Sequence, residues 1–546
     1  MNDQMKRKED NRLWKERLSF ENKWFSFFFA IGLFMVFFLL YMTYLPKDFF
    51  TDEKDVFMNG FLVSRGGRLY GNVVSQHMPF SYYISVVISW FRPINGYQYR
   101  IGFYVLLSAL FVAIFFRNRK VVSPFALVIG PAFYIDFLPR VELAHVMISD
   151  HWQGIGIGII LLEVFRYIRE KRISVGMACW ISFGIMLSFG CTFVSAFAIF
   201  PIVTAVVAMQ TYRILKASGD NRKALTREIL LDDLRLAGIV LLPFAILSVY
   251  YLITGNFGNF IKGAYTINTD IYSKYQGGLG SSALDAFVQG IRGFIDECGE
   301  HVYNLFHLRF LHYFNIVFLV FAVCVLAVSG YMIAKKRIAA GLGWLGACIY
   351  CGIRGFENFH GMAYFFMGSM SLALMIGWCI NRIRIKKWYI IPAAVMLLFV
   401  AKTMAGLPLE IRKTVDDFAL VSSVDTRKEM IDTILDPGDE IHITNVDQLS
   451  YTYDYQRSVD YNPTVSTPWT YECWGTEEMA SMKKNQPKAV FYSSGIRTWG
   501  YNLDQYGADL VKYIRENYTR YENTDLWIRN DYMPEALERL NAANAG

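Results

Sequence analysis

The chain has 546 residues, of which 54% are apolar, 16% aromatic and only 18% charged. An ordinary soluble domain carries about 25% charged residues, so this composition argues against a set of soluble domains and against a disordered chain. The net charge of +7 does not indicate a nucleic-acid binder, because the lysines and arginines lie in short segments between apolar blocks. These blocks are roughly 17–25 residues long, enough to cross a hydrocarbon layer about 30 Å thick. The sequence therefore predicts a multispanning membrane protein.

The basic flanks of the apolar blocks predict the topology. Residues 1–23 are a basic segment before a first block from about Trp24 to Leu45, which is too long for a signal-peptide core. Basic flanks stay in the cytoplasm, so we expect the N-terminus inside and residues 46–99 outside. Further single spans are expected at about 100–116, 121–138, 236–254, 309–334 and 388–406, and one more just before the basic run at 166–172. Two pairs of spans are expected, one in 173–212 and one in 338–380. These are about eleven helices in a multi-pass plasma (inner) membrane, with the predicted loop 213–235 inside.

The expected organisation is a transmembrane domain over 24–406, with outer loops at 46–99 and 255–308, and a polar domain over 407–546. An odd number of spans places this last domain outside the cytoplasm. Its sequence predicts strands at Glu440–Thr444, Ala489–Tyr492 and Leu526–Arg529, and a helix at Asp509–Tyr518. Alternation of strands and helices is typical of a small α/β domain.

The most informative segment follows the first apolar block. It carries three carboxylates, Asp52, Glu53 and Asp55, and its apolar residues recur at helical spacing. The segment is therefore expected to be a helix that lies in the membrane interface. A carboxylate at the edge of a low-dielectric region is suited to act as a general base. The alternative is that these carboxylates only solvate the end of a helix.

The order of motifs resembles the GT-C superfamily of membrane glycosyltransferases, close to family 39, which includes protein O-mannosyltransferases and bacterial lipid A aminoarabinose transferases. The matching residues are the acidic pair Asp52-Glu53, the turn Gly67-Arg-Leu-Tyr70, the step His77-Met-Pro79 followed by Tyr82-Tyr83, Arg100 at the start of a helix, and Arg140 followed by Asp150 in an outer loop. The chain departs from the pattern at Gly71-Asn72, where many relatives have an acid, and around Cys191-Thr192, where many have a lysine.

The resemblance implies a polytopic, GT-C-like α-helical enzyme that transfers a sugar with inversion from a polyprenyl-phosphate donor. The acceptor would be a hydroxyl of a glycan, a lipid or a protein on the extracytoplasmic side, and membrane lipid would surround the donor. Asp52 would be the catalytic base, with Glu53 as its neighbour and substitute. Three outward arginines, Arg100, Arg140 and Arg354, would bind the donor phosphate. The predicted substrate-binding residues are Asp55, His77, Tyr82, Asp150, His151 and His360.

Four histidines, His77, His145, His151 and His360, are expected on the outer side. Together with the carboxylates they could bind a divalent cation. None of them shows a metal-binding spacing such as His-x-x-x-His, so no metal ligand and no cofactor are assigned.

Two other functions are compatible with a multispanning chain. A transporter would carry ionisable residues near helix midpoints and broken helices in two related halves, whereas the charges here cluster at helix ends. A membrane sensor would use the C-terminal domain to bind a ligand, but about eleven spans exceed what an anchor needs.

Overall fold

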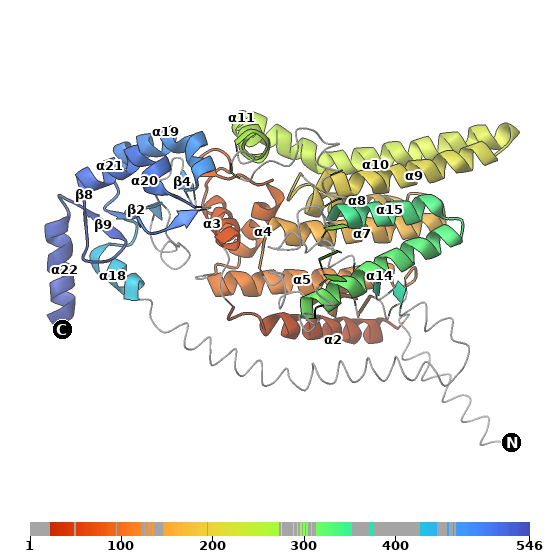
Figure 1. Cartoon of the computed structure of the whole chain (residues 1–546), viewed down its shortest axis with the longest axis horizontal. Coiled ribbons are helices and arrows are strands. Elements are labelled where there is room, and N and C mark those ends of the chain that lie inside the picture. Colours follow the sequence, from red (N-terminus) through yellow and green to blue (C-terminus); the bar gives the residue numbers. More distant parts are fainter. Residues whose placement is uncertain are drawn as a thin grey trace, which may run out of the picture.

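The structure is a computed structural model. It describes residues 22–47, 51–93, 96–122, 146–193, 195–271, 313–351, 426–444, 466–498 and 500–545, with short pieces and single residues within 124–135, 275–307 and 368–375 and at 456–457 and 462–463. The described chain is mostly helical, and a small domain with a β-sheet lies at its C-terminal end (Figure 1).

The helices of the first part are α2 (Lys23–Met42), α3 (Thr51–Ser64), α4 (Phe80–Ser89), α5 (Gly96–Asn118), α7 (Ser149–Glu170), α8 (Val175–Ser188), α9 (Ser195–Lys216), α10 (Gly219–Ile253), α11 (Phe257–Ile261), the π-helix η1 (Lys262–Ile271), α14 (Tyr313–Ala334) and α15 (Ile338–Cys351). Four helical stretches are long and apolar enough to cross a membrane by length and composition: Lys23–Met42, Gly96–Asn118, Ala198–Lys216 and Gly219–Ile253. These stretches fit a membrane protein, because each has at least 19 residues, close to or above the roughly 20 residues that span the hydrocarbon layer.

The helices α2, α5, α7, α8, α9, α14 and α15 lie where the sequence predicts spans. The segment 213–235 is not a loop as the sequence predicts, because most of it forms the first half of the 35-residue helix α10. This half contains many good helix formers and lacks proline, so its charged residues do not interrupt the helix. The predicted span at 388–406 and most of the second half of 338–380 lie outside the described residues, and the span predicted at 121–138 is described only in part. The number of about eleven spans stays a prediction.

Helices α7 and α8 pack closely because both carry glycine at their contact. A Cβ atom on Gly156 would lie 2.4 Å from the carbonyl oxygen of Gly184, so a larger residue would force the helices apart. Small residues at such a contact are typical of helix pairs in membranes. The main apolar core runs through α2, α5 and α7, where Phe37, Phe111 and Ile155 are fully buried.

The C-terminal domain contains α18 (Thr426–Ile434), β2 (Glu440–Ile443), β3 (Gln456–Arg457), β4 (Asn462–Pro463), α19 (Pro468–Asn485), β5 (Ala489–Phe491), β6 (Arg497–Thr498), β7 (Tyr501–Asn502), α20 (Leu503–Tyr506), α21 (Ala508–Asn517), β8 (Tyr518–Arg520), β9 (Leu526–Arg529) and α22 (Met533–Ala545). A five-stranded sheet has the order β3-β2-β5-β9-β8; β2 is parallel to both β3 and β5, and β9 is antiparallel to β5 and β8. The strands predicted at β2, β5 and β9 and the helix predicted at α21 are confirmed.

Successive residues of β5 enter two separate cores, one on each face of the sheet. Ala489 and Phe491 pack with side chains of α18 and α22. Val490 packs with side chains of α19 and α21 on the other face. This alternation follows from the two-residue period of a strand, and helices on both faces explain why all three residues are apolar.

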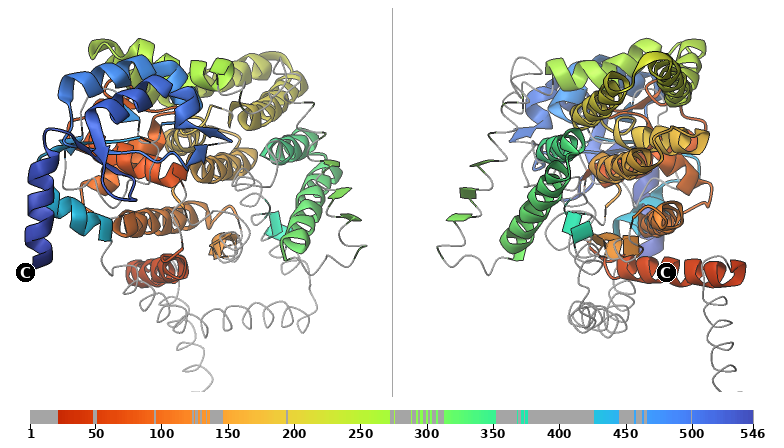
Figure 2. Two further views of the ribbon diagram at one scale, coloured as in Figure 1. Left: turned by 60° about the vertical axis from the view of Figure 1, so that its left-hand side comes forward. Right: turned by 90° about the vertical axis from the view of Figure 1, so that its right-hand side faces the viewer.

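The C-terminal domain lies against the segment between α3 and α4. The short strand β1 (Val73–Val74) pairs in parallel with β4, so that Val73 is opposite Asn462. The blue C-terminal domain is accordingly next to the orange helices α3 and α4 in Figure 1 and in the left view of Figure 2. The acidic helix α3 is thus positioned between the bundle and the C-terminal domain.

Candidate active site

The acidic segment forms the first turn of α3, as the sequence predicts. Carboxylates in the first turn stabilise a helix because they face its positive end. Glu53 is fully buried, whereas Asp52 and Asp55 are half-buried. Residues three apart lie on the same side of a helix, so Asp52 and Asp55 lie next to each other on the more accessible side of α3.

Glu53 forms an ion pair with Arg100, the residue that begins the predicted second span. Arg100 Nε donates to Glu53 Oε1 at 3.0 Å, its Nη2 donates to the other carboxylate oxygen, and both side chains are fully buried. Arg100 also donates to the carbonyl oxygens of Leu45, at 3.0 Å, and Lys47, and the Met147 amide donates to Glu53 at 3.3 Å. The pair therefore joins α3, α5, the segment that follows α2 and the segment before α7.

This geometry changes how the two residues are interpreted. Removing one partner of a buried ion pair typically costs about 3–5 kcal/mol, because the other charge stays buried without compensation. Glu53 and Arg100 thus fix the position of α3, a role that the sequence did not indicate. Binding of a donor phosphate by Arg100 stays a prediction, and in this structure its guanidinium group is fully buried.

Asp55 belongs to a chain of hydrogen bonds. Its carboxylate accepts from Tyr82 Oη at 2.8 Å and from Asn59 Nδ2 at 3.0 Å, and Ser75 donates to the Tyr82 hydroxyl. Burial, and after it the charge of Asp55, raises the pKa of Tyr82 well above its ordinary value. Tyr82 is therefore protonated near neutral pH and donates to Asp55. The structure brings Asp55 and Tyr82 together, and sequence analysis missed Ser75.

The turn before His77 is held in an unusual conformation. Tyr70 has a φ of 62°, in the left-handed region that a bulky residue rarely adopts. Its ring packs edge-on against Tyr251 at 5.6 Å and Phe260 at 5.4 Å, and its hydroxyl donates to the His77 carbonyl oxygen. Strained conformations persist where the surroundings hold them. Here the contacts of Tyr70 fix the path of the chain from α3 to His77, which is half-buried.

Gln76 connects this turn to two distant segments. Its carbonyl oxygen accepts from Asn268 Nδ2 of η1 at 2.6 Å, and its side-chain oxygen accepts from the indole N–H of Trp469 at the start of α19. Trp469 and Trp474 are buried in a small core with Ile267 of η1. These tryptophans therefore dock the C-terminal domain against η1 and the turn at Gln76.

Helix α7 begins beside two other predicted site residues. Asp150 is half-buried and His151 is fully buried. The imidazole of His151 packs edge-on against Phe103 at 5.2 Å and Tyr134 at 5.4 Å, and neither ring nitrogen has a hydrogen-bond partner among the described residues. Arg140, Arg354 and His360 lie outside the described residues. The pairing of Arg140 with Asp150 therefore stays a prediction.

A metal site is not formed by the part of the chain that the structure describes. Within it, no three His, Cys, Asp or Glu side chains lie close enough to hold an ion. Of the four histidines considered in the sequence, His145 and His360 are outside that part.

Comparison of the chain with protein-family models and with curated proteins finds no match. The functional argument therefore depends on the site itself.

Proposed function

We propose that the chain is an inverting glycosyltransferase that moves a sugar from a polyprenyl-phosphate donor to an acceptor hydroxyl on the extracytoplasmic side of a membrane. The observation that carries the proposal is the position of α3. Its accessible carboxylate Asp52 is adjacent to the buried Glu53–Arg100 pair, where the bundle meets the C-terminal domain. A rigidly held carboxylate at the boundary of a membrane domain can act on a substrate that is itself anchored in the membrane.

In the proposed reaction, the Asp52 carboxylate takes the proton of the acceptor hydroxyl. The hydroxyl oxygen then attacks the anomeric carbon of the sugar from the face opposite the phosphate. The bond between this carbon and the phosphate oxygen breaks, and its electron pair stays on the polyprenyl phosphate, which leaves. A positioned general base typically contributes roughly 10²–10⁴ in rate.

The neighbouring residues have different proposed roles. Glu53 is a positioning residue rather than a substitute base, because it is fully buried and paired with Arg100. Asp55 is the alternative base, one helical turn after Asp52, and its hydrogen bonds to Tyr82 and Asn59 would have to loosen for it to take a proton. Arg140 and Arg354 remain the proposed cations for the leaving phosphate.

The C-terminal domain is proposed to shape the acceptor side of the site. Its contact with Gln76 is one residue from His77 and one residue from Ser75, which begins the hydrogen-bond chain to Asp55. The domain would therefore influence the geometry of the acidic helix without contributing the base.

The test is release of polyprenyl phosphate by the purified full-length protein in lipid nanodiscs. A panel of polyprenyl-phosphate sugars is supplied with cell-envelope glycans, lipids and peptides as acceptors. The proposal predicts turnover with at least one donor, and loss of turnover in Asp52→Asn. The matched control is Asp220→Asn, an exposed carboxylate in the first turn of α10. Failure of every donor to react would contradict the proposal.

A further inference from the structure

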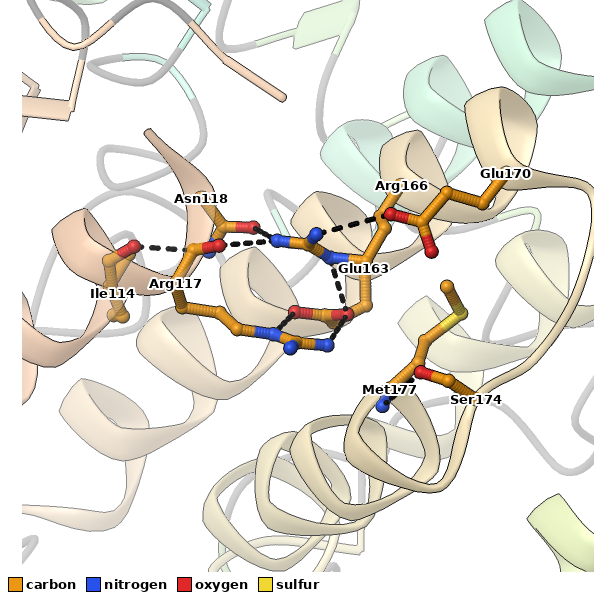
Figure 3. Close-up of polar contacts among 8 residues, drawn as sticks. All are labelled: Ile114, Arg117, Asn118, Glu163, Arg166, Glu170, Ser174 and Met177. Carbon is orange, nitrogen blue, oxygen red and sulfur yellow. Dashed lines mark hydrogen bonds and ion pairs between the residues drawn. The ribbon is translucent and has the colours of Figure 1, made fainter. Parts of the chain in front are cut away.

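The ends of α5 and α7 carry a group of paired charges, which lies beside the start of α8 (Figure 3). Glu163 is almost fully buried and accepts from Arg117 Nε at 2.8 Å and Nη2 at 2.9 Å. Arg166 forms ion pairs with Glu163 at 3.2 Å and with Glu170 at 3.3 Å. The two carboxylates at this end of α7 are thus already occupied by Arg117 and Arg166.

A second set of cations, Lys171, Arg213 and Arg337, lies close to this group. Arg213 Nη1, at the end of α9, donates to the Lys171 carbonyl oxygen at 3.0 Å and to Tyr167 Oη at 3.1 Å. Lys171 follows α7 in a left-handed conformation, with a φ of 62°. The Arg213 side chain thus bridges the end of α9 to the end of α7.

The packing of α15 against α9 places Arg337 near Arg213. A Cβ atom on Gly343 would lie 2.7 Å from that of Ala205, and one on Gly346 would lie 3.0 Å from Pro201. Residue numbers thus rise along α15 while they fall along α9, so α9 and α15 are antiparallel. Arg337 immediately precedes α15 and so lies near the end of α9 that carries Arg213.

These three cations differ from the arginines of the neighbouring group in their partners. In the described chain, neither Lys171 nor Arg213 nor Arg337 forms an ion pair with a carboxylate, whereas the nearby Arg172 pairs with Glu228 at 3.0 Å. Burial lowers the pKa of Lys171, and the charges of Arg213 and Arg337 lower it further. The charges of Arg213 and Arg337 thus act on Lys171, and a group of like positive charges favours binding of an anion.

The surface beside the cations is apolar and exposed. On α9, Leu215 is 64% exposed, and on α15 Ile338 and Leu342 are 56% and 55% exposed. Tyr212 is also exposed, and the Lys216 ammonium lies 4.9 Å from the centroid of its ring. Aromatic and basic residues next to exposed leucines are typical of the level at which lipid headgroups meet acyl chains.

We propose that Lys171, Arg213 and Arg337 bind the phosphate group of an anionic phospholipid, whose acyl chains lie along the exposed apolar side chains of α9 and α15. Arginine contacts phosphate through two parallel N–H groups, and lysine adds a point charge. The apolar surface favours a lipid over a free phosphate ion, because only the lipid covers both parts of the site. This site does not depend on the proposed transferase activity.

The experiment measures lipid binding to the full-length protein in a neutral detergent by native mass spectrometry. The probes are phosphatidylglycerol, phosphatidylcholine and inorganic phosphate. The wild-type protein should retain phosphatidylglycerol in preference to the other two. The triple variant Lys171→Gln, Arg213→Gln, Arg337→Gln should lose affinity for phosphatidylglycerol about tenfold or more, since each cation near a lipid surface contributes to binding.

The matched control has the same change in charge on another part of the surface. It is the triple variant Arg222→Gln, Lys223→Gln, Arg227→Gln, whose residues are all exposed on α10. The single variant Arg337→Gln provides a milder change if the first triple variant does not fold, and it should still weaken binding. Equal loss in the two triple variants, no loss in Arg337→Gln, or retention of inorganic phosphate as strong as that of the lipid would overturn the proposal.

Discussion

Arg100 and Glu53 form a buried ion pair in which Nε lies 3.0 Å from Oε1, although the two residues are 47 positions apart in the chain. The pair connects the acidic helix α3 to the long helix α5. Because Glu53 is followed by Asp55 and preceded by Asp52, the same contact sets the position of all three carboxylates. The buried pair is therefore one of the contacts that organise the candidate site.

The first prediction concerns this pair. Arg100→Ala should lower the free energy of unfolding by about 3–5 kcal/mol, because the Glu53 charge would remain buried without a partner. Arg100→Lys should restore only part of the loss, since lysine lacks the planar fork. Thermal unfolding in detergent measures both effects. Arg172→Ala, which breaks an exposed pair with Glu228, should cost about 0–1 kcal/mol. Equal effects of Arg100→Ala and Arg172→Ala would show that the buried pair does not hold α3.

A second prediction compares two adjacent tyrosines. Tyr82→Phe removes the hydroxyl that donates to the charged Asp55 carboxylate, whereas Tyr83→Phe removes a contact of 3.1 Å between two neutral hydroxyls, those of Tyr83 and Tyr251. Hydrogen bonds to charged groups contribute about 1.5–3 kcal/mol and neutral ones about 0.5–1.5 kcal/mol. Tyr82→Phe should therefore be the more destabilising change in chemical unfolding. The reverse order would contradict the hydrogen-bond chain described for Asp55.

The third prediction tests the docking of the C-terminal domain. Trp469→Ala should increase hydrogen exchange of backbone amides in 73–79 and 262–271, because the indole ring fills the core between these segments. Truncation of a buried aromatic residue typically costs about 3–5 kcal/mol. The control Trp527→Phe removes an indole N–H bond within the domain, to the Tyr492 carbonyl oxygen. It should leave exchange in 73–79 unchanged. Unchanged exchange in Trp469→Ala would mean that this contact does not hold the domain.

Part of the structure could be predicted from the sequence, because local patterns suffice for it. The apolar blocks predict α2 and α5, and short alternating or apolar runs predict β2, β5 and β9. Contacts between distant segments could not be predicted in this way. The bond from Trp469 to Gln76 joins residues 393 positions apart, and the pairing of Glu53 with Arg100 depends on how α3 folds back on α5. The sequence shows which residues are charged, but packing determines which of them are buried and paired.

Topology provides a fourth prediction. Single cysteines replace exposed residues at Lys223, in the basic half of α10, and at Glu516, in the C-terminal domain. A membrane-impermeant maleimide should label the cysteine at position 516 in intact cells, and the one at position 223 only after permeabilisation, because basic segments stay in the cytoplasm. The parental chain controls for its native cysteines. Labelling of position 516 only after permeabilisation would place the C-terminal domain and the acidic helix on the cytoplasmic side, whereas the proposed reaction takes place on the extracytoplasmic side.

The central claim is that Asp52 is the catalytic base, and the most direct measurement is kcat for transfer from the polyprenyl-phosphate donor. Asp52→Asn keeps the size of the side chain and removes its basicity, so kcat should fall by roughly 10²–10⁴. Asp55→Asn should retain more activity than Asp52→Asn, and Asp220→Asn should equal the wild type. A kcat of Asp52→Asn close to that of the wild type, with activity lost in Asp55→Asn instead, would contradict the account and place the base one helical turn further along α3.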